Sequence, residues 1–304
     1  MSPTSSSSAA PLRVALDNSA LGNVLVDEES VRRFAVHVQG RGFHTFVSDV
    51  VLDELFADPN AAKVLGRLKN LRSLCRLLEP SLWRIPDHHS FMSAEGRGRR
   101  DVWRAYYRDW GFVTAVPDSA LEEHARLTES HAARVRQTKQ EFFDLDRDLA
   151  RWTATERNIQ VTPSEIAKQI ECAGFPREDD MMIEHAFGLS GHRYTAAQIA
   201  ARPRRFRAIH ATSHLVWRLC LANVADRDST SSTDEQVIGR WRTKAKGGKG
   251  AWYDAFIAGS AAYMDVFVTD DADLLWRCER LRERGLLGFR SVPLNEFTGG
   301  AQTA

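Results

Sequence analysis

A run of apolar residues near the C-terminus ends abruptly in acidic residues, and this feature limits the fold more than any other. Val266, Phe267 and Val268 have the character of a buried strand, and Thr269 is followed at once by the segment 270–273, "DDAD". Continuous apolar runs of this kind are typical of strands that are covered on both faces in a parallel sheet. The chain therefore places crowded negative charge at the end of a buried strand.

The N-terminal part of the chain shows the same order of elements. The apolar run Leu12–Leu16 predicts a buried strand, and it also ends in an acid, Asp17. Asn18 and Ser19 are good helix-start residues, and we expect a helix from there to about Gln39.

A second strand and helix follow. The strand is predicted over 43–47, "FHTFV", with Ser48 as the cap of the next helix, "DVVLDELFAD". Strand, helix, strand and helix in this order indicate right-handed crossovers and a parallel sheet.

The C-terminal part repeats this pattern. A helix over 251–264 is expected before the strand at 265–269, and a helix over 271–285 before a short strand at 289–294. Gly285 is well placed to stop its helix. Both ends of the chain therefore predict the same kind of α/β layer.

The middle of the chain, residues 94–247, differs from both ends. It has few strand-like runs, much helical periodicity and two well-marked helix starts, "TPSE" at 162–165 and "TAAQ" at 195–198. We therefore predict an α/β fold with a parallel sheet, interrupted by a mostly α-helical insertion. The predicted parts are a disordered tail over 1–11, a core formed by 12–93 and 248–298, and the insertion over 94–247.

Composition and cysteine spacing exclude two classes of protein. No run of about 18 apolar residues exists, and the opening "MSPTSSSSAA" lacks the features of a signal peptide, so we expect no membrane partner. The four cysteines are far apart and form no CxxC pair, which indicates reduced, mostly structural thiols in a cytoplasmic protein. The net charge of +1 conceals basic clusters at 97–100, 202–207 and 240–250.

Acids from distant parts of the sequence are predicted to meet at one edge of the sheet. Parallel strands share the edge formed by their carboxyl ends, and ligands bind at that edge in open α/β sheets. Asp17 follows the first strand, and Asp271, with Asp270 as its rival, follows the C-terminal apolar run. Glu54 lies about two turns into the second helix, and Asp254 opens the helix before that run.

Such a cluster of carboxylates requires a neutralising partner. Like charges at about 4 Å repel by about 1 kcal/mol in water and by several times that where the effective dielectric is low. Protons or a cation must offset the repulsion, and all-oxygen ligation suits Mg²⁺ or Mn²⁺ rather than zinc. His210 and His214 are spaced i, i+4 but lack a third partner in the sequence, so we interpret them as ordinary helix residues.

Each acid also has an ordinary structural interpretation. Asp17 could cap a helix, and so could Thr269 or Asp270 at the start of the helix that follows them. Glu54 could be a surface residue, and Asp254 could interact only with its helix dipole. The combination favours a shared site, because all four acids fall at predicted edge positions of one sheet.

Together these segments resemble the PIN-domain nuclease family. The resemblance rests on "VALDNSAL", "SDVVLDELF" and "YDAFIAGSAAYMDVFVTDDADLL", covers only the two ends of the chain, and implies a PIN-like three-layer fold. The implied metal-binding and catalytic acids are Asp17, Glu54, Asp254 and Asp271. Further metal-ligand candidates are Asp270 and Asp273, and the candidates for positioning ligand or phosphate are Asn18 and Thr269.

The resemblance implies metal-dependent hydrolysis of phosphodiester bonds. One or two Mg²⁺ or Mn²⁺ ions would bind the scissile phosphate and lower the pKa of a bound water, which attacks in line and leaves a 5′-phosphate and a 3′-hydroxyl. We expect an endoribonuclease of the toxin or defence type, with RNA favoured over DNA as its partner. The sequence leaves open an inhibitor or accessory protein and the oligomeric state.

Several basic and aromatic residues gain a predicted role in binding nucleic acid. The basic residues are Lys244, Lys246, Lys249, Arg204, Arg205 and Arg207. Trp241, Trp252 and Tyr253 are interpreted either as stacking platforms for unpaired bases or, as is commoner at such positions, as core residues.

Three other functions match parts of the pattern. A single-strand or flap DNA nuclease would use the same acids, and a catalytically silent PIN-like module would bind RNA or a protein partner. The presence of all four acids argues against the silent module. A phosphate-handling Rossmann-like enzyme is disfavoured, because no G-x-G-x-x-G or Walker loop follows the first strand.

Overall fold

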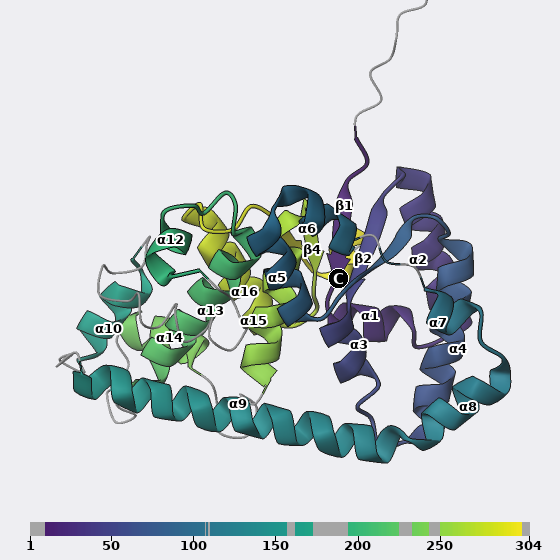
Figure 1. Ribbon diagram of the computed structural model, residues 1–304, viewed down its shortest axis with the longest axis horizontal. Helices are drawn as coiled ribbons and strands as arrows, with labels where there is room; N and C mark the ends of the chain where they lie inside the picture. Colours follow the sequence, from purple (N-terminus) through teal and green to yellow (C-terminus); the bar gives the residue numbers. More distant parts are fainter. Residues whose placement is uncertain are drawn as a thin grey trace, which may run out of the picture.

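The predicted parallel sheet is present, and it carries five strands. The computed structural model of the chain describes residues 10–106, 108, 110–156, 162–172, 194–224, 233–242 and 250–299. The strands are β1 (Arg13–Leu16), β2 (His44–Ser48), β3 (Leu82–Ile85), β4 (Val266–Val268) and β5 (Arg290–Val292). Their order is β3-β2-β1-β4-β5, and every neighbouring pair is parallel (Figure 1).

Helices form most of the remaining described chain, an arrangement compatible with a three-layer α/β fold. Those from the two ends of the chain are α1 (Asn18–Val24), α2 (Glu28–Arg41), α3 (Asp49–Leu55), α4 (Ala61–Leu77), α15 (Ala251–Ser260), η3 (Ala261–Tyr263), α16 (Ala272–Glu283) and α17 (Leu294–Phe297). Those between β3 and α15 are α5 (His88–Arg97), α6 (Arg99–Tyr106), α7 (Gly111–Thr114), α8 (Asp118–Arg126), α9 (Thr128–Glu156), α10 (Pro163–Ile170), α12 (Ala196–Ala200), α13 (Arg207–Val224) and α14 (Thr233–Trp241). No helix in the described ranges has an apolar stretch long enough to cross a membrane.

The strand order reverses between β1 and β4. From β1 the chain moves outward through β2 to β3, and after the long helical segment it returns beside β1 as β4 before adding β5. The crevice outside the carboxyl ends of strands at such a reversal is the usual ligand position in an open α/β sheet. Asp17 and Thr269 follow β1 and β4 directly, and the Asp17 N–H donates to the Val268 carbonyl at 3.0 Å.

The first two predicted strands are confirmed to within one residue, but the helix between them is not continuous. The single helix expected from Asn18 to Gln39 is wrong, because α1 ends at Val24 and α2 begins four residues later. Asp27 caps α2 by accepting from the Ser30 N–H at 2.7 Å. The acid thus starts a second helix and breaks the apparent periodicity.

The sequence prediction missed the strand β3. β3 is an edge strand of the sheet; it pairs with β2 and forms one antiparallel bridge, between Arg84 and Arg108, and its two central residues are half-buried. Its apolar pattern is therefore weak, which is why the sequence did not reveal it. Ser48 caps α3 as expected and accepts from the Val51 N–H at 3.3 Å.

The C-terminal elements agree with the sequence prediction. β4, α16 and β5 lie within the predicted ranges. Gly285 adopts a left-handed φ of 73° after α16, and its N–H donates to the Arg282 carbonyl at 2.8 Å. The next N–H, of Leu286, donates to Leu281 at 3.0 Å. This pair of bonds ends the helix as expected for a glycine at that position.

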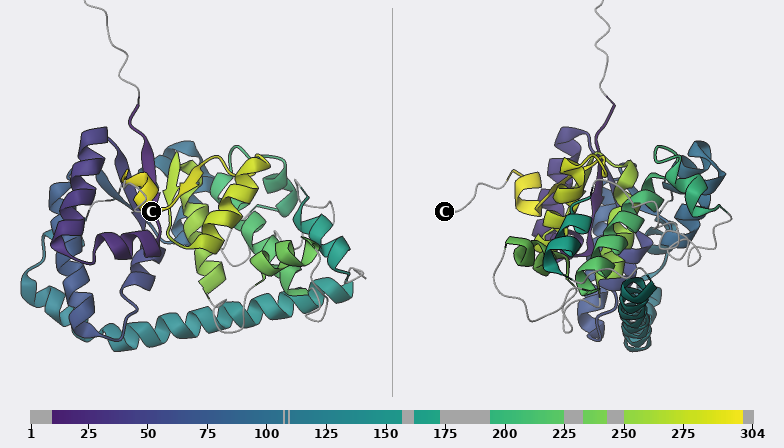
Figure 2. Two further views of the ribbon diagram at one scale, coloured as in Figure 1. Left: turned by 180° about the vertical axis from the view of Figure 1, so that it is seen from behind. Right: turned by 90° about the vertical axis from the view of Figure 1, so that its left-hand side faces the viewer.

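The segment predicted as an insertion is helical in its described parts but is not a separate body. Its predicted start at residue 94 falls inside α5. Buried Ile166 and Trp217 belong to the same hydrophobic cluster as Phe267 of β4. In both face views α9 runs along the base of the molecule, from the α4 and α8 side to the α10 and α14 side (Figures 1 and 2).

Two smaller predictions concern the tail and the cysteines. Residues 1–9 of the expected disordered tail lie outside the described residues, whereas Ala10 and Pro11 are described and exposed. All four cysteines are free thiols; Cys172 is exposed and the other three are buried. The expected cytoplasmic location stays a prediction.

Helices α13 and α15 approach most closely at Gly259. A methyl group on Gly259 would overlap the Thr212 hydroxyl and lie 3.2 Å from the Ala208 carbonyl oxygen. Because that oxygen belongs to the backbone of α13, it cannot rotate away as a side chain would. The missing side chain therefore lets the helical segment dock directly on α15.

The contact at Gly259 predicts a large penalty for a small substitution. Gly259→Ala should destabilise the protein by about 1–3 kcal/mol through overpacking. Gly239→Ala is the matched control, since nothing lies within 4 Å of a methyl group there, and better helix propensity should raise stability by up to about 1 kcal/mol. Urea unfolding measures both variants. Wild-type stability in Gly259→Ala would contradict the described packing of α13 on α15.

Candidate functional site

Asp17 is fixed at the carboxyl end of β1 by donors that follow two different strands. It is the N-cap of α1, so one ordinary interpretation of this acid is confirmed. Its carboxylate accepts from the Ser19 N–H, from the Ser19 hydroxyl at 3.0 Å and from the Thr269 hydroxyl. Only 4% of Asp17 is exposed, and this burial raises its pKa to about 6 despite those bonds. Asp17 is thus a preorganised carboxylate with an unusually high affinity for a proton.

Thr269 and Ser19 link the acids of β1 and β4. Thr269 is fully buried, and its hydroxyl accepts from the Asp271 N–H at 3.1 Å while donating to Asp17. The Ser19 hydroxyl accepts from the Asp270 N–H at 2.8 Å. Because Thr269 is buried and donates to Asp17, it positions that carboxylate and is not open to a phosphate.

The structure separates the two rival acids that follow β4. Asp271, and neither Thr269 nor Asp270, caps α16, and its side chain accepts from the Leu274 N–H at 2.8 Å. Asp270 uses one oxygen to accept from Asn23 at 2.7 Å and the other to accept from the Leu294 N–H at 2.8 Å. Asp270 therefore ties α17 to α1, and Asp271 is the acid whose charge acts on Glu54 and Asp254.

Glu54 meets a lysine from the insertion. Its side chain, 7% exposed, forms a close ion pair with Lys139 of α9. Lys139 also lies 5.0 Å from the ring centre of Tyr253. Burial raises the pKa of Glu54, and Lys139 opposes that rise. Lys139 therefore supplies a cation that partly offsets the burial of this carboxylate.

Asp254 is the least compensated acid of the group. It lies in the first turn of α15, where it is half-buried. In the described part of the chain, no hydrogen bond or ion pair engages its carboxylate. Burial raises its pKa well above the usual value, with a further rise from the charge of Glu54 and an opposing effect of Arg277.

The four predicted acids thus share one electrostatic environment at the reversal of strand order. The charges of Glu54, Asp271 and Asp17 each raise the pKa of Asp254, and the charge of Asp271 raises that of Glu54. Like charges act in this way only at short range. The sequence prediction that these acids gather is consistent with this arrangement.

The donor set suits a hard cation in chemistry, although the four side chains do not converge as a ready set of ligands. All four donors are carboxylates, and Asp254 has no partner of its own in the described chain. Within the same residues, no three His, Cys, Asp or Glu side chains form a group that could hold a metal ion. Glu54 is engaged by Lys139 instead, so a cation would compete with that ammonium group.

Other predicted site residues lie elsewhere or have other tasks. Asp273 is exposed in the first turn of α16, and Asn18 is half-exposed as the first residue of α1. Trp241, Trp252 and Tyr253 are buried, which confirms the commoner interpretation of them as core residues over that of stacking platforms. Lys244, Lys246 and Lys249 lie outside the described residues.

The arginines predicted to extend the grip on nucleic acid lie at the opposite edge of the sheet. Arg205 donates to the Gly96 carbonyl at 2.7 Å, and Arg207 lies 5.6 Å from the ring centre of Tyr263. Tyr263 precedes β4, whereas the acids follow it. Arg204 is exposed in the same turn as Arg205. This placement does not support a role for the three arginines beside the acids.

His210 and His214 are ordinary helix residues, as expected. Both are buried in α13. His210 contacts the Ile199 carbonyl at 2.9 Å, and His214 contacts Arg218 at 3.0 Å. Burial lowers the pKa of both rings, so they stay neutral and belong to the packing of the helix.

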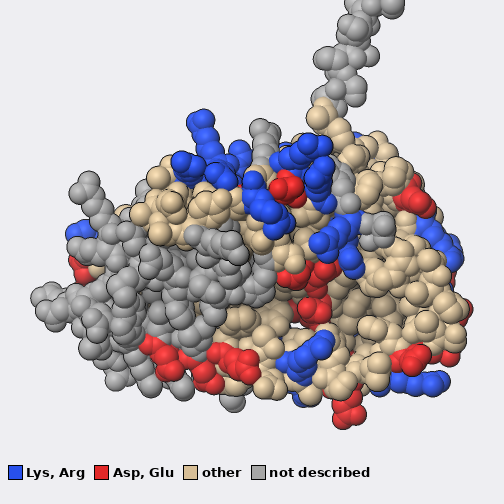
Figure 3. All heavy atoms as spheres, viewed as in Figure 1, with Lys and Arg blue, Asp and Glu red and all other residues tan. Residues whose placement is uncertain are grey.

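A basic surface to which the sequence prediction gave no role lies over α5 and α6. Figure 3 shows basic side chains gathered there, all arginines in these two helices, with acidic side chains in the hollow just below them in the view. A shallow depression of about 410 Å³ is lined by Arg97, Arg104, Arg108, Ser90 and Ser93, with Asp101 as its acid. The charge of Arg108 also reaches Asp49 at the start of α3.

Comparison with known proteins adds no relationship. The chain matches no family model, no curated protein and no solved structure. Its resemblance to PIN-domain nucleases therefore stays a prediction from the sequence motifs.

Asp254 provides a test of the shared electrostatic environment. Asp254→Asn should stabilise the metal-free protein by about 1 kcal/mol at pH 8, because it removes one charge from a crowded site. A raised pKa means that the folded state binds the proton more tightly than the unfolded chain. The wild-type protein therefore loses stability as the pH rises from the ordinary aspartate range through the pKa of Asp254 in the folded state. The difference in stability between Asp254→Asn and wild type should disappear near pH 4.

Thermal melts in EDTA at the two pH values measure this effect. Asp273→Asn is the matched control, since Asp273 is exposed in the first turn of its own helix. It should cost a few tenths of a kcal/mol through the helix dipole. A loss of stability in Asp254→Asn at pH 8 would mean that the acids do not share one site.

Proposed function

We propose that the protein is a metal-dependent endonuclease of the PIN-like type, and that it acts on RNA. The observation that carries the proposal is that Asp17, Glu54, Asp254 and Asp271 influence one another's charge at the reversal of strand order, and that the pKa values of Asp17, Glu54 and Asp254 are raised, mainly by burial. Perturbed carboxylates at the ligand edge of an α/β sheet are typical of functional sites.

The four acids would hold Mg²⁺ or Mn²⁺. Bound there, such an ion would neutralise the acids, bind a phosphodiester and lower the pKa of a water molecule. Asp17 is held ready by Ser19 and Thr269, and Asp254 has no partner in the described chain that a cation must displace. Glu54 has to leave Lys139, which would free an ammonium group beside the site for contact with a phosphate.

One observation favours a second function, the catalytically silent binding module. The Lys139–Glu54 pair already neutralises one of the four acids without a metal. A buried pair of this kind could be permanent, in which case the fold would bind nucleic acid without cleaving it. The same acids would also serve a DNA nuclease, and the choice between RNA and DNA requires both substrates in the assay.

Catalysis by the acids is the first test of this proposal. Asp17→Asn, Asp254→Asn and Asp271→Asn should each reduce Mn²⁺-dependent cleavage of labelled RNA to the level seen with EDTA. Asparagine caps helices about as well as aspartate, so α1 and α16 should keep their starts. Asp270→Asn is the control, because both oxygens of Asp270 bind other groups, and it should keep cleavage. Wild-type rates in the first three variants would overturn the proposed site.

The basic surface over α5 and α6 gives a test of nucleic-acid binding that does not depend on cleavage. Replacing Arg97, Arg104 and Arg108 together by alanine should lower the slope of log K against log salt by about 2 for single strands, the value for three lost phosphate contacts. Binding is measured in EDTA by fluorescence anisotropy. The control replaces Arg32 and Arg33, which are exposed on α2. An unchanged slope would show that the phosphates contact another surface of the protein. The variant with alanine at Lys244, Lys246 and Lys249 would then test the loop that the sequence analysis favoured.

A further inference from the structure

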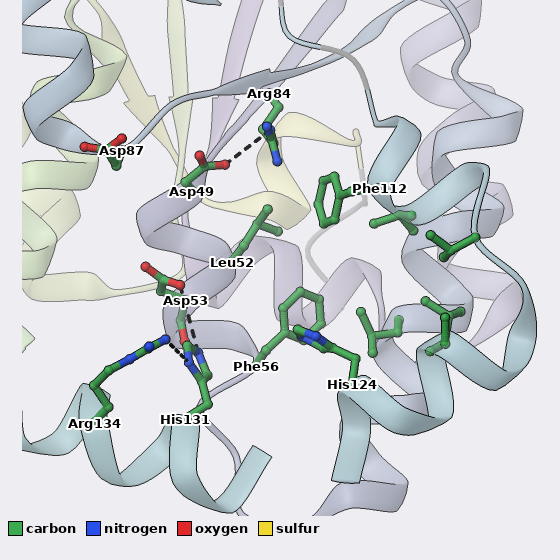
Figure 4. A pocket seen from close by; sticks show the side chains of 15 residues that line it. Asp49, Leu52, Asp53, Phe56, Arg84, Asp87, Phe112, His124, His131 and Arg134 are labelled. Atoms are coloured by element: carbon green, nitrogen blue, oxygen red, sulfur yellow. Dashed lines mark hydrogen bonds and ion pairs between the residues drawn. The ribbon is translucent and has the colours of Figure 1, made fainter. Parts of the chain in front are cut away.

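A pocket of about 550 Å³ lies at the same edge of the sheet as the acids, beside the other face of α3. Its walls come from α3, α4, the end of β3, α7, α8 and α9 (Figure 4). Asp53 lines the pocket, whereas its neighbour Glu54 belongs to the acidic site. Pockets of this size accommodate a small organic ligand.

One wall of the pocket is apolar and partly aromatic. Leu52, Phe56 and Val113 contribute buried apolar surface, and Phe112 stands at the side with 46% of its surface exposed. The guanidinium of Arg84 lies 4.7 Å from the centre of the Phe112 ring. The guanidinium lies over the ring, and Trp110 is stacked against Phe112 with ring centres 5.9 Å apart. These planar groups form a layered wall against which a base could pack.

The polar groups of the pocket place an acceptor beside a donor. Asp49 and Arg84 form an ion pair at 3.3 Å, and about a quarter of each side chain remains exposed. In the described part of the chain neither side chain makes a hydrogen bond, and the two buried facing atoms, Asp49 Oδ1 and Arg84 Nε, have only each other as partners. The other oxygen of Asp49 and the terminal nitrogens of Arg84 therefore keep hydrogen-bonding capacity for a ligand.

The geometry points to a binding site for a nucleobase of the substrate, and we propose that this pocket holds a base next to the scissile phosphate. This inference rests on the proposed nuclease function. A base is flat, fits the volume and presents hydrogen-bond donors next to acceptors along one edge. Asp49 would accept from its ring or amino N–H groups, and Arg84 would donate to its carbonyl oxygen.

Among the four bases, guanine matches this wall best. Its ring N–H and amino group are adjacent donors that suit a carboxylate, and its carbonyl oxygen beside them suits arginine. Asp53 and Asp87 add further acceptors at the rim, while His131 is held by Arg134 at 2.9 Å and faces Asp53 (Figure 4).

The test uses the full chain in EDTA and titrates it with GMP, AMP, CMP and UMP by isothermal calorimetry or NMR. GMP should bind tightest. Asp49→Asn should weaken GMP by about tenfold and remove most of its advantage over the other three. Phe112→Ala should weaken all four nucleotides by a similar factor, since stacking does not distinguish bases. Leu127→Ala, an exposed apolar residue outside the pocket, should change nothing.

Two results would overturn the proposal that this pocket binds a base. One is unchanged GMP affinity in both Asp49→Asn and Phe112→Ala, and the other is competition by inorganic phosphate that abolishes all binding, which would assign the affinity to the phosphate alone. Cleavage of RNA by the same preparations in Mn²⁺ separates this inference from the proposed function. Cleavage without base binding would reject the base-binding pocket and support the nuclease function. Base binding without cleavage would support the pocket and reject the nuclease function.

Discussion

The repulsion among four carboxylates at the reversal of strand order is the constraint to which the rest of this structure responds. The ends of β1 and β4 fix two of the acids within a hydrogen-bonded network through Thr269 and Ser19, so these charges cannot move apart. The pKa values of Asp17, Glu54 and Asp254 are raised, mainly by burial and in addition by this repulsion. The described chain offsets it with cations from distant elements: Lys139 pairs with Glu54, and the charge of Arg277 acts on Asp254.

The need for these cations explains why the helical insertion cannot be separated from the α/β core. Lys139 belongs to α9, in the middle of the insertion, and it reaches a glutamate of α3. α13 packs on α15 at Gly259, five residues after Asp254. A compact sheet domain cut free of the insertion would lose the partner of Glu54 and expose the face of α15. Sequence position alone suggests an appended module, but charge and packing make the insertion part of the site.

Local sequence patterns predicted four of the five strands and the position at which α16 ends. Apolar runs marked β1, β2, β4 and β5, and Gly285 marked the end of α16, because each signal lies within a few residues of its effect. The acids could be grouped because parallel strands share one edge. Lys139 could not be found in this way: nothing near it in sequence distinguishes it from other lysines of an amphipathic helix, and only the fold brings α9 to Glu54. The aromatic residues just before Asp254 could be stacking platforms or core residues by sequence alone, and only the packing of α9 and α13 on α15 shows that they are core residues.

The two faces of α3 connect the acidic site with the neighbouring pocket. Asp53 and Glu54 are consecutive, so they point about 100° apart around the helix axis, and each is met by a residue of α9: His131 lies beside Asp53 and Lys139 beside Glu54. These two residues of α9 are eight positions apart, about two turns, and therefore share one face of that helix. A cation that displaces Lys139 and a ligand that engages Asp53 would both act on this single α3–α9 contact. Because the contact is partly buried, a ligand at one of these two sites would change the electrostatic field and the packing at the other. In the proposed nuclease this would link the binding of a base directly to the assembly of the acidic centre.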